Sequence, residues 1–370
     1  MSDTMIGRLG VLTGRGQGPA PVTEPEFASR LSQLAPRFGL ELILFPPEGV
    51  APDGSIPHGY VRTPSGWKEC ASPAPGVLYN RFFPADARER RAAGAALNAL
   101  RGAVPLSRGL PDKWRVHRHL TASPAAELLP ETHLYSGRGF ALILAEREDG
   151  VFLKPAAGSQ GRGVLRAVRL PGGGLRLAGR DAGNRSFVRD YADEAEGGDA
   201  VRRFTAGRPY LLQPCLPLCD SAGRPFDLRV LAQKDGRARW TVSGMAVRLG
   251  RPGTAASNLH GGGTAVPPEP FLAAEFGPGA AAAVLRDVRE AAAGLPPLLE
   301  AGFGRLGELG LDFGIDPGGR IWLLEANSKP GRTVFRLTGD TEAERRAAEN
   351  PLRYARCLLQ SRRPAAFPRQ

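Results

Sequence analysis

Lysine is scarce in a chain that is otherwise strongly basic. Only five of its 49 basic residues are lysines, and the formal net charge is +12. Arginine presents a planar fork of donors, whereas the lysine ammonium is a compact point charge. Because the chain uses arginine almost everywhere, a lysine inside a motif is informative, and Lys113 and Lys154 are two such residues.

Cysteines and long apolar runs are also scarce. The four cysteines lie far apart except for Cys215 and Cys219, and so large a chain is not expected to hold a disulfide framework. The Cys215/Cys219 pair has no nearby histidine or second cysteine pair, so it is a weak metal signal. The apolar runs are too short to span a membrane, and no signal sequence is evident. We therefore expect a cytoplasmic protein with no membrane span.

The positive charge does not indicate nucleic acid as a partner. Basic residues are spread along the chain and are not interleaved with aromatic residues, which make up 7% of the sequence. Only the C-terminal tail is basic and free of acids over a short stretch. A solvated, arginine-rich surface is the expected interpretation.

The segment 311–332, LDFGIDPGGRIWLLEANSKPGR, predicts a β-hairpin. Two apolar runs, Leu311–Ile315 and Arg320–Asn327, flank the turn-forming residues Asp316–Gly319. The chain is long enough for two or three domains with cores of their own, and we expect the others to be organised around this hairpin.

Two acids and an amide converge on one face of the predicted hairpin. A turn centred on the Pro-Gly pair places Asp312 opposite Leu323, with Glu325 one diagonal step away. Asn327 shares the face of Glu325 because strand side chains alternate. Buried like charges are costly unless a cation lies between them. Hard oxygen ligands suit Mg²⁺ or Mn²⁺, and the alternative is an exposed hairpin edge with solvated acids.

A glycine-rich loop between two predicted strands indicates an anion site. Lys154 ends the first strand, and the glycines of the loop can turn backbone N–H groups toward a phosphate. No helix follows, which excludes a Walker A loop and a Rossmann fingerprint. The alternative is a flexible glycine-rich hairpin. The loop residues in question are Gly158, Ser159, Gln160, Gly161 and Gly163.

These motifs occur in the order found in the ATP-grasp superfamily. The chain most resembles its YheC/YheD group, sporulation-associated proteins of Gram-positive spore formers, and is also similar to ribosomal-protein glutamate ligases and D-alanine–D-alanine ligases. The motifs that carry the resemblance are Lys113, Lys154 with GSQGRG, the strand LLQPCL, FDLRVL, SNLHGGG, and Asp312 followed by Glu325-Ala-Asn327.

The resemblance implies an α/β, more closely α+β, fold with nucleotide bound between antiparallel sheets. It implies a preATP-grasp-like α/β domain over residues 1–111, an N-terminal ATP-grasp subdomain with the glycine-rich loop over 112–195, a C-terminal subdomain with the metal site over 196–360, and a basic tail over 361–370. Strand–helix alternation in residues 1–111 agrees with the first of these domains.

The resemblance also implies a role for each motif residue. Lysines contact the nucleotide phosphates, the glycine loop covers them, a strand holds adenine and acids bind one or two Mg²⁺. In this scheme the phosphate contacts are Lys113 and Lys154, with Lys154 also near adenine, and the loop is Gly158–Gly163. Adenine is held by Gln213 through Leu216, and Asp220 is the candidate ribose partner. Phosphate charge is stabilised by Arg229, Asn258 lies near the triphosphate, and the metal is bound by Asp312, Glu325 and Asn327.

The implied activity is an ATP- and Mg²⁺-dependent ligase that joins a carboxylate to an amine through an acylphosphate, with a link to the spore coat or cell envelope. Related ligases often carry an arginine just before SNLH, where this chain has Ala255 and Ala256. Either Arg248 or Arg251 substitutes, or phosphate stabilisation is weaker. The alternatives are a non-catalytic ATP-binding structural protein of a spore coat and an ATP-grasp kinase.

Overall fold

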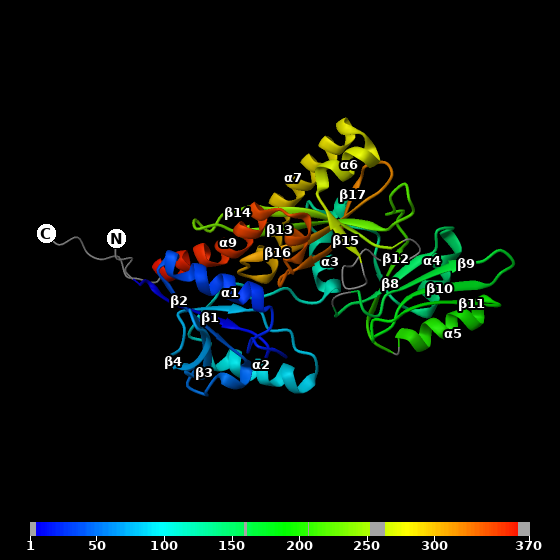
Figure 1. Cartoon of the computed structure of the whole chain (residues 1–370). Helices are drawn as coiled ribbons and strands as arrows, with labels where there is room; N and C mark the ends of the chain where they lie inside the picture. The colour runs from blue at the N-terminus through cyan, green and yellow to red at the C-terminus, as the bar shows by residue number, and fades with distance from the viewer. Residues whose placement is uncertain (1–4, 159–160, 206, 252–262, 362–370) are drawn as a thin grey trace.

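Three β-sheets, each packed against its own helices, form three neighbouring lobes (Figure 1). The computed structural model describes residues 5–158, 161–205, 207–251 and 263–361. Ser159, Gln160 and Asn258, which the sequence places in the nucleotide site, lie outside the described residues. The mixture of parallel and antiparallel sheets with helices confirms the predicted α/β, more closely α+β, class.

The first sheet has the strand order β4-β3-β2-β1-β5-β6. Strands β1, β2, β5 and β6 run parallel, and β3 and β4 form an antiparallel hairpin at one edge. The parallel strands are buried by helices, as parallel strands usually are. The elements are β1 (Gly7–Leu12), α1 (Pro25–Leu34), η1 (Ala35–Phe38), β2 (Leu40–Phe45), η2 (Pro47–Gly49), β3 (Ile56–Thr63), β4 (Gly66–Ser72), β5 (Val77–Asn80), α2 (Ala87–Ala99) and β6 (Val104–Pro105).

The second sheet is antiparallel, with the order β11-β10-β9-β8-β12-β7. Leu153 and Leu212 on its covered face pack with Phe140 and Leu144 of α4 and Val201 of α5. The opposite face of this sheet borders the cleft described below. The elements are β7 (His133–Leu134), α4 (Gly137–Glu146), β8 (Val151–Pro155), β9 (Leu165–Arg169), β10 (Leu175–Arg180), β11 (Ser186–Tyr191), α5 (Glu194–Thr205) and β12 (Tyr210–Pro214). The short helix η3 (Ala126–Leu128), which precedes them, packs against the third lobe.

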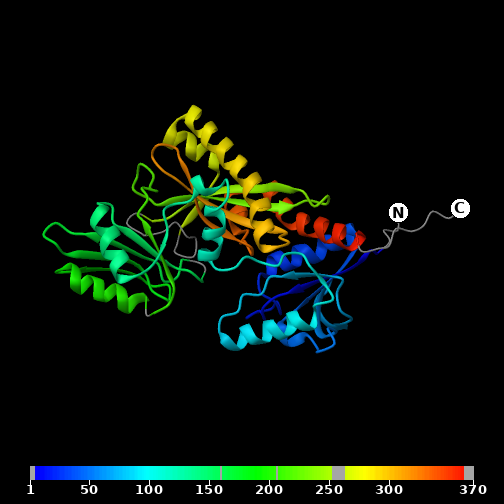
Figure 2. The same cartoon turned by 180° about the vertical axis from the view of Figure 1, so that it is seen from behind.

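The third sheet, with the order β15-β14-β13-β16-β17, contains the predicted hairpin. Its largest core cluster packs Leu228 and Leu311 against Val288 and Leu295 of α7. Figure 2, which shows the molecule from behind, shows α6 and α7 lying across one face of this sheet. The elements are α3 (Lys113–Thr121), β13 (Phe226–Lys234), β14 (Trp240–Leu249), β15 (Thr264–Val266), α6 (Pro268–Phe276), α7 (Pro278–Phe303), β16 (Glu308–Ile315), β17 (Ile321–Asn327), α8 (Thr333–Thr338) and α9 (Thr341–Gln360).

Several elements depart from the domain boundaries expected from the sequence, β12 and α9 among them. Strand β12 pairs with β8 of the second sheet, so that sheet extends past residue 195. Helix α9 packs against β13 and β14, and its apolar residues Leu352 and Leu358 also enter the core of the first sheet. The C-terminal helix therefore joins the first and third lobes. None of the helices in the described part of the chain is long and apolar enough to cross a membrane.

A buried charged cluster also ties the first lobe to the third. Arg81 is 2% exposed and pairs with Glu24 at 2.7 Å and with Glu308 at 3.1 Å. The hydroxyl of Tyr79 donates to Glu308 at 2.7 Å, and an Nη2–H of Arg81 donates to the carbonyl of Pro330 at 3.1 Å. This cluster fixes the segment that follows β17, directly after Asn327.

Candidate nucleotide and metal site

A cleft of about 280 Å³ lies between the second and third sheets. Phe152 and Lys154 line it from β8, because residues two apart share a strand face. Leu324 and Glu325 line it from β17. The apolar walls that Phe152 and Leu324 form were not predicted from the sequence. Their positions close to Lys154 and Glu325 in the chain could have indicated them.

Lys113 connects three parts of the cleft. Asp112 caps α3 by accepting a hydrogen bond from the backbone N–H of Arg115 at 3.0 Å. Lys113, at the first position of α3, donates to the carbonyl of Gly158 at 2.5 Å and lies 3.3 Å from Oε1 of Glu325. A cation in the first helical turn opposes the helix dipole. Its contacts with the glycine loop and with Glu325 offset that cost.

Lys154 is a half-buried cation whose hydrogen-bond partner is a neutral group. Its Nζ donates to the carbonyl of Leu324 at 3.0 Å, which links the second sheet to the third. Burial lowers the pKa of Lys154 to about 8. The negative charges of Glu325 and Asp312 oppose this decrease, whereas the positive charge of Lys113 adds to it. An anion entering the cleft would therefore stabilise the protonated form of Lys154.

The hairpin forms as predicted, but the predicted register is wrong. Asp312 lies directly opposite Glu325, and Leu323 pairs with Phe313 instead of Asp312. An irregularity in the ladder between Asp312 and Phe313 leaves Leu324 as an extra residue on β17, which is a β-bulge. The bulge brings the two carboxylates into one cross-strand pair, closer than the predicted diagonal.

Asp312 lies in a buried network of two acids and two arginines. Its Oδ1 accepts from Nε of Arg229 at 2.5 Å, and its Oδ2 accepts from Arg229 and Arg248 at 3.0 Å each. Arg248 also donates to Asp227 at 2.6 Å. Burial alone would raise the pKa of Asp312, but the charges of Arg229 and Arg248 outweigh it and hold the pKa below its usual value.

The network shows which arginine faces the cleft. Of the described residues that line the cleft, Arg248 is one and Arg229 is not. Arg229 instead contacts Asp312 from the neighbouring strand, where the two residues are cross-strand partners. Arg248 is one of the two residues named above as substitutes for the missing arginine. It has the better position for contact with a phosphate.

The donor set fits a hard divalent cation. Asp312 and Glu325, one cross-strand pair, would supply carboxylate oxygens, and Asn327, two residues further along β17, would supply an amide oxygen. In the described parts of the chain, no three His, Cys, Asp or Glu side chains gather as metal ligands would. Such a site would thus be completed by the amide and by phosphate oxygens, which is typical of Mg²⁺.

Removal of the Asp312 charge should destabilise the fold. We expect Asp312→Asn to lower the free energy of unfolding by about 3 kcal/mol, because it leaves Arg229 buried without its acid. Urea unfolding at pH 7 measures the loss. Asp199→Asn, at an exposed position of α5, is the control for the loss of one acidic charge. Equal stability of Asp312→Asn and the wild type would contradict the importance of this ion pair.

The strand predicted to hold adenine borders the cleft, but the side chains of Gln213 in this strand and of Asp220 after it form their hydrogen bonds elsewhere. The amide of Gln213 donates to the hydroxyl of Thr132 at 2.7 Å and is buried. Leu216 lines the cleft. The carboxylate of Asp220 pairs with Arg224 at 2.7 Å within its own turn, and Asp220 does not appear among the described residues that line the cleft.

The glycine loop joins two antiparallel strands, as predicted, and its glycines adopt positive φ. Strands β8 and β9 pair on either side of it. Gly158, Gly161 and Gly163 have φ of 145°, 68° and 71°. At Gly163 a Cβ atom would lie 3.0 Å from the hydroxyl of Tyr210. Side chains at these positions would strain the backbone.

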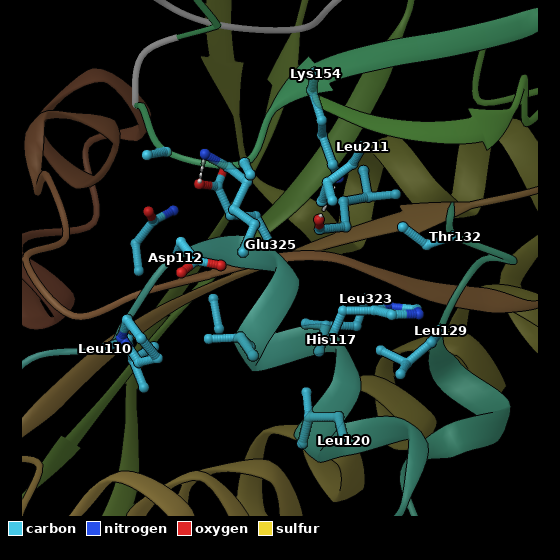
Figure 3. Close-up of a pocket in the computed structure, with 18 of the residues that line it drawn as sticks. Leu110, Asp112, His117, Leu120, Leu129, Thr132, Lys154, Leu211, Leu323 and Glu325 are labelled. Atoms are coloured by element: carbon cyan, nitrogen blue, oxygen red, sulfur yellow. Dashed lines mark hydrogen bonds and ion pairs between the residues drawn. The ribbon is translucent and has the colours of Figure 1, made fainter. Parts of the chain in front are cut away.

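A second cavity of about 330 Å³ adjoins the cleft on the other side of the Lys154–Leu324 contact. Figure 3 shows it between α3, which supplies His117 and Leu120, and strands β12 and β17, which supply Leu211 and Leu323. Asn327 lines this cavity, and Glu325 borders both spaces. A reactant in the second cavity would therefore lie next to the candidate metal ligands.

The three lobes, with a cleft between two antiparallel sheets, define an ATP-grasp fold. The family model for YheC/D-like ATP-grasp proteins matches residues 103–358, and the chain belongs to this family. It is 29% identical over 337 residues to the endospore coat-associated protein YheC of Bacillus subtilis (strain 168), an alignment that covers 87% of this chain and 89% of YheC.

Solved structures share the fold. The structure of the D-cycloserine synthetase DcsG matches 96% of this chain and 99% of its own, with a TM-score of 0.55 and 15% identity. The VanG D-Ala:D-Ser ligase from Enterococcus faecalis matches 95% and 98%, with a TM-score of 0.53 and 12% identity. At these identities the likeness concerns the fold alone.

Proposed function

We propose that this chain is an ATP- and Mg²⁺-dependent ligase that joins a carboxylate to an amine through an acylphosphate. The observation that carries the proposal is the meeting of Asp312, Glu325, Lys113 and Lys154 at one cleft. Two acids suit a metal and two lysines suit phosphates, so the four groups together match a metal–triphosphate complex. The ligase names of the structures with the same fold support this proposal.

The proposed reaction needs positioning and charge neutralisation from the protein. A carboxylate oxygen of the substrate attacks the γ-phosphorus, the bond to the bridging oxygen of ADP breaks, and an acylphosphate forms. The amine nitrogen then attacks the acyl carbon, loses a proton, and phosphate leaves with the former carboxylate oxygen. Mg²⁺ at Asp312, Glu325 and Asn327 would neutralise phosphate charge. Lys113, Lys154 and Arg248 would stabilise the oxygens.

The remaining roles follow from the cleft walls. Phe152 and Leu324 would hold the adenine ring, with the backbone from Gln213 to Leu216 along its edge. The cavity beside Glu325 and Asn327 gives the carboxylate substrate a place next to the phosphates. Spore-coat association follows from the name of YheC and is part of the proposal for this chain.

Release of ADP and phosphate tests the proposal. Mg²⁺-ATP is incubated with the protein, with and without pooled amino acids and envelope peptides, and hydroxylamine is added to trap an acylphosphate as a hydroxamate. Substrate-dependent ADP release with hydroxamate formation supports a ligase. ADP release with a phosphorylated product and no free phosphate would indicate a kinase instead. Nucleotide binding without turnover in any pool would favour a non-catalytic protein.

Nucleotide affinity should depend on pH through Lys154. Its pKa is about 8 in the free protein because of burial, and phosphate charge would raise it. Affinity for Mg²⁺-ADP is then greatest below pH 8 and falls as pH rises through 8, with a proton taken up on binding near pH 8. Calorimetry at pH 7 and pH 9 measures both effects. In Lys154→Arg, which stays charged, the decline should disappear; an unchanged decline would contradict this assignment.

A further inference from the structure

An arginine-lined groove of about 730 Å³ lies away from the nucleotide cleft. It forms where α9 passes the turn between β13 and β14 and the end of η1. Figure 1 places α9 on the side of the third sheet away from the second sheet. No described residue lines both this groove and the cleft. The charged groups that line the groove are Arg237, Arg345, Arg346, Arg353 and Arg356, with Asp235 and Glu349.

Positive charge exceeds negative charge in this groove. Glu349 pairs with Arg345 at 2.8 Å and with Arg353 at 2.9 Å, so one carboxylate serves two arginines. Glu342 pairs with Arg345 as well and with Arg346, so two acids are shared by three arginines of α9. Such sharing leaves a positive excess that draws anions to the surface.

Two further arginines of the groove form no ion pair with an acid in the described part of the chain. Arg356 donates to the carbonyl of Phe38 at 3.0 Å, a neutral group that does not offset its charge. Arg237 is exposed, and its side chain forms no ion pair with any described residue. The acid beside it, Asp235, pairs with Arg239 at 3.1 Å. These two guanidinium groups therefore keep free donors for a ligand.

The arginines form a row that is too long for a single small anion. Arg345, Arg353 and Arg356 follow one another at helical spacings on one face of α9. From the first to the last, the helix rises about 16 Å. An extended peptide covers this length with about five residues. Planar guanidinium groups bind carboxylates with two parallel hydrogen bonds, which suits acidic side chains along such a peptide.

The groove suits a peptide better than a nucleic acid. Its aromatic lining residue, Phe38, lies 5.3 Å from the guanidinium of Arg353, which occupies the face a base would need for stacking. Gln360, which is exposed, adds a polar group for a peptide backbone.

We propose that this groove binds an acidic polypeptide segment, which it holds away from the nucleotide cleft. The inference stands independently of the proposed ligase activity, because no residue of the groove belongs to the cleft.

Binding of fluorescein-labelled deca-glutamate to the full chain tests this inference. The double variant Arg237→Gln/Arg356→Gln should bind the peptide about tenfold more weakly than the wild type, because two charge-assisted contacts are lost. The control Arg88→Gln/Arg90→Gln removes the same charge from the surface of α2 and should bind like the wild type. Arg237→Glu, on an exposed turn, gives a second measure should the double variant fold poorly.

Competition separates the proposed partner from other anions. Unlabelled deca-glutamate should displace the probe, whereas a ten-nucleotide deoxythymidine strand and inorganic phosphate at equal charge concentration should not. Stronger displacement by the oligonucleotide would overturn the peptide assignment in favour of nucleic acid. Displacement by phosphate would indicate a small-anion site. Equal losses in the groove and α2 variants would show that net charge alone attracts the peptide.

Discussion

Glu325→Gln is expected to abolish magnesium-dependent nucleotide binding and to leave the protein folded. Glu325 lies directly opposite Asp312 and borders both the cleft and the second cavity. Glutamine keeps the shape but removes the charge that a hard cation needs. The expected loss of Mg²⁺-ATP affinity is about a hundredfold, on the order of 3 kcal/mol.

The same substitution should cost little stability. The partner of Glu325 is Lys113, at 3.3 Å, and the Glu325 side chain is 26% exposed. A partly exposed pair of this kind contributes about 0–1 kcal/mol. Calorimetry with and without Mg²⁺, combined with urea unfolding, measures both quantities. Glu290→Gln, on the exposed face of α7, is the matched control. Full Mg²⁺-dependent affinity in Glu325→Gln would remove Glu325 from the metal site.

Lys154→Met is expected to abolish nucleotide binding while making the ligand-free protein more stable. The half-buried ammonium donates to the carbonyl of Leu324 and forms no ion pair with a described residue, so the fold bears the cost of partly burying this charge. Methionine fills the same space without that charge. Loss of a phosphate contact should weaken ATP binding about a hundredfold, and stability should rise by about 1–3 kcal/mol at pH 7.

The lowered pKa of Lys154 determines how this gain in stability changes with pH. Burial lowers the pKa of Lys154 to about 8 from an ordinary value of 10.5. The folded state therefore binds fewer protons than the unfolded state between these values, and wild-type stability from this residue rises with pH across that window. The advantage of Lys154→Met should be greatest below pH 8 and shrink toward pH 10.5.

Urea unfolding at pH 7 and pH 9.5 measures the trend. Lys68→Met, at an exposed position of β4, is the control and should show no such trend. A lower stability of Lys154→Met than of the wild type at pH 7, or a gain that does not change with pH, would contradict the account of Lys154.

Motif order and local spacing were sufficient to predict the fold and most of the cleft. The hairpin was recognisable because its apolar runs flank a Pro-Gly turn, and Lys113 and Lys154 stood out in an arginine-rich chain. The first of these lysines lies where α3 begins, behind its cap Asp112. Features of this kind depend on residues that are neighbours in the chain, so sequence patterns can indicate them.

Features that depend on distant strands were not predictable in the same way. The bulge at Leu324 arises in pairing between β16 and β17, and no turn rule indicates it. Arg229 and Arg248 meet Asp312 only when β13, β14 and β16 lie side by side. Likewise, the side chain of Gln213 turns to Thr132, 81 residues away in the chain, in a contact that spacing does not reveal.

Transfer of ¹⁸O tests the central claim most directly. The protein is incubated with Mg²⁺-ATP, an amine pool and a pool of amino acids and peptides whose carboxylates carry ¹⁸O, and the released phosphate is analysed by mass spectrometry. A ligase that acts through an acylphosphate transfers one ¹⁸O atom from the carboxylate to each phosphate released. Phosphate that is released in a substrate-dependent reaction but carries no ¹⁸O would contradict the acylphosphate mechanism.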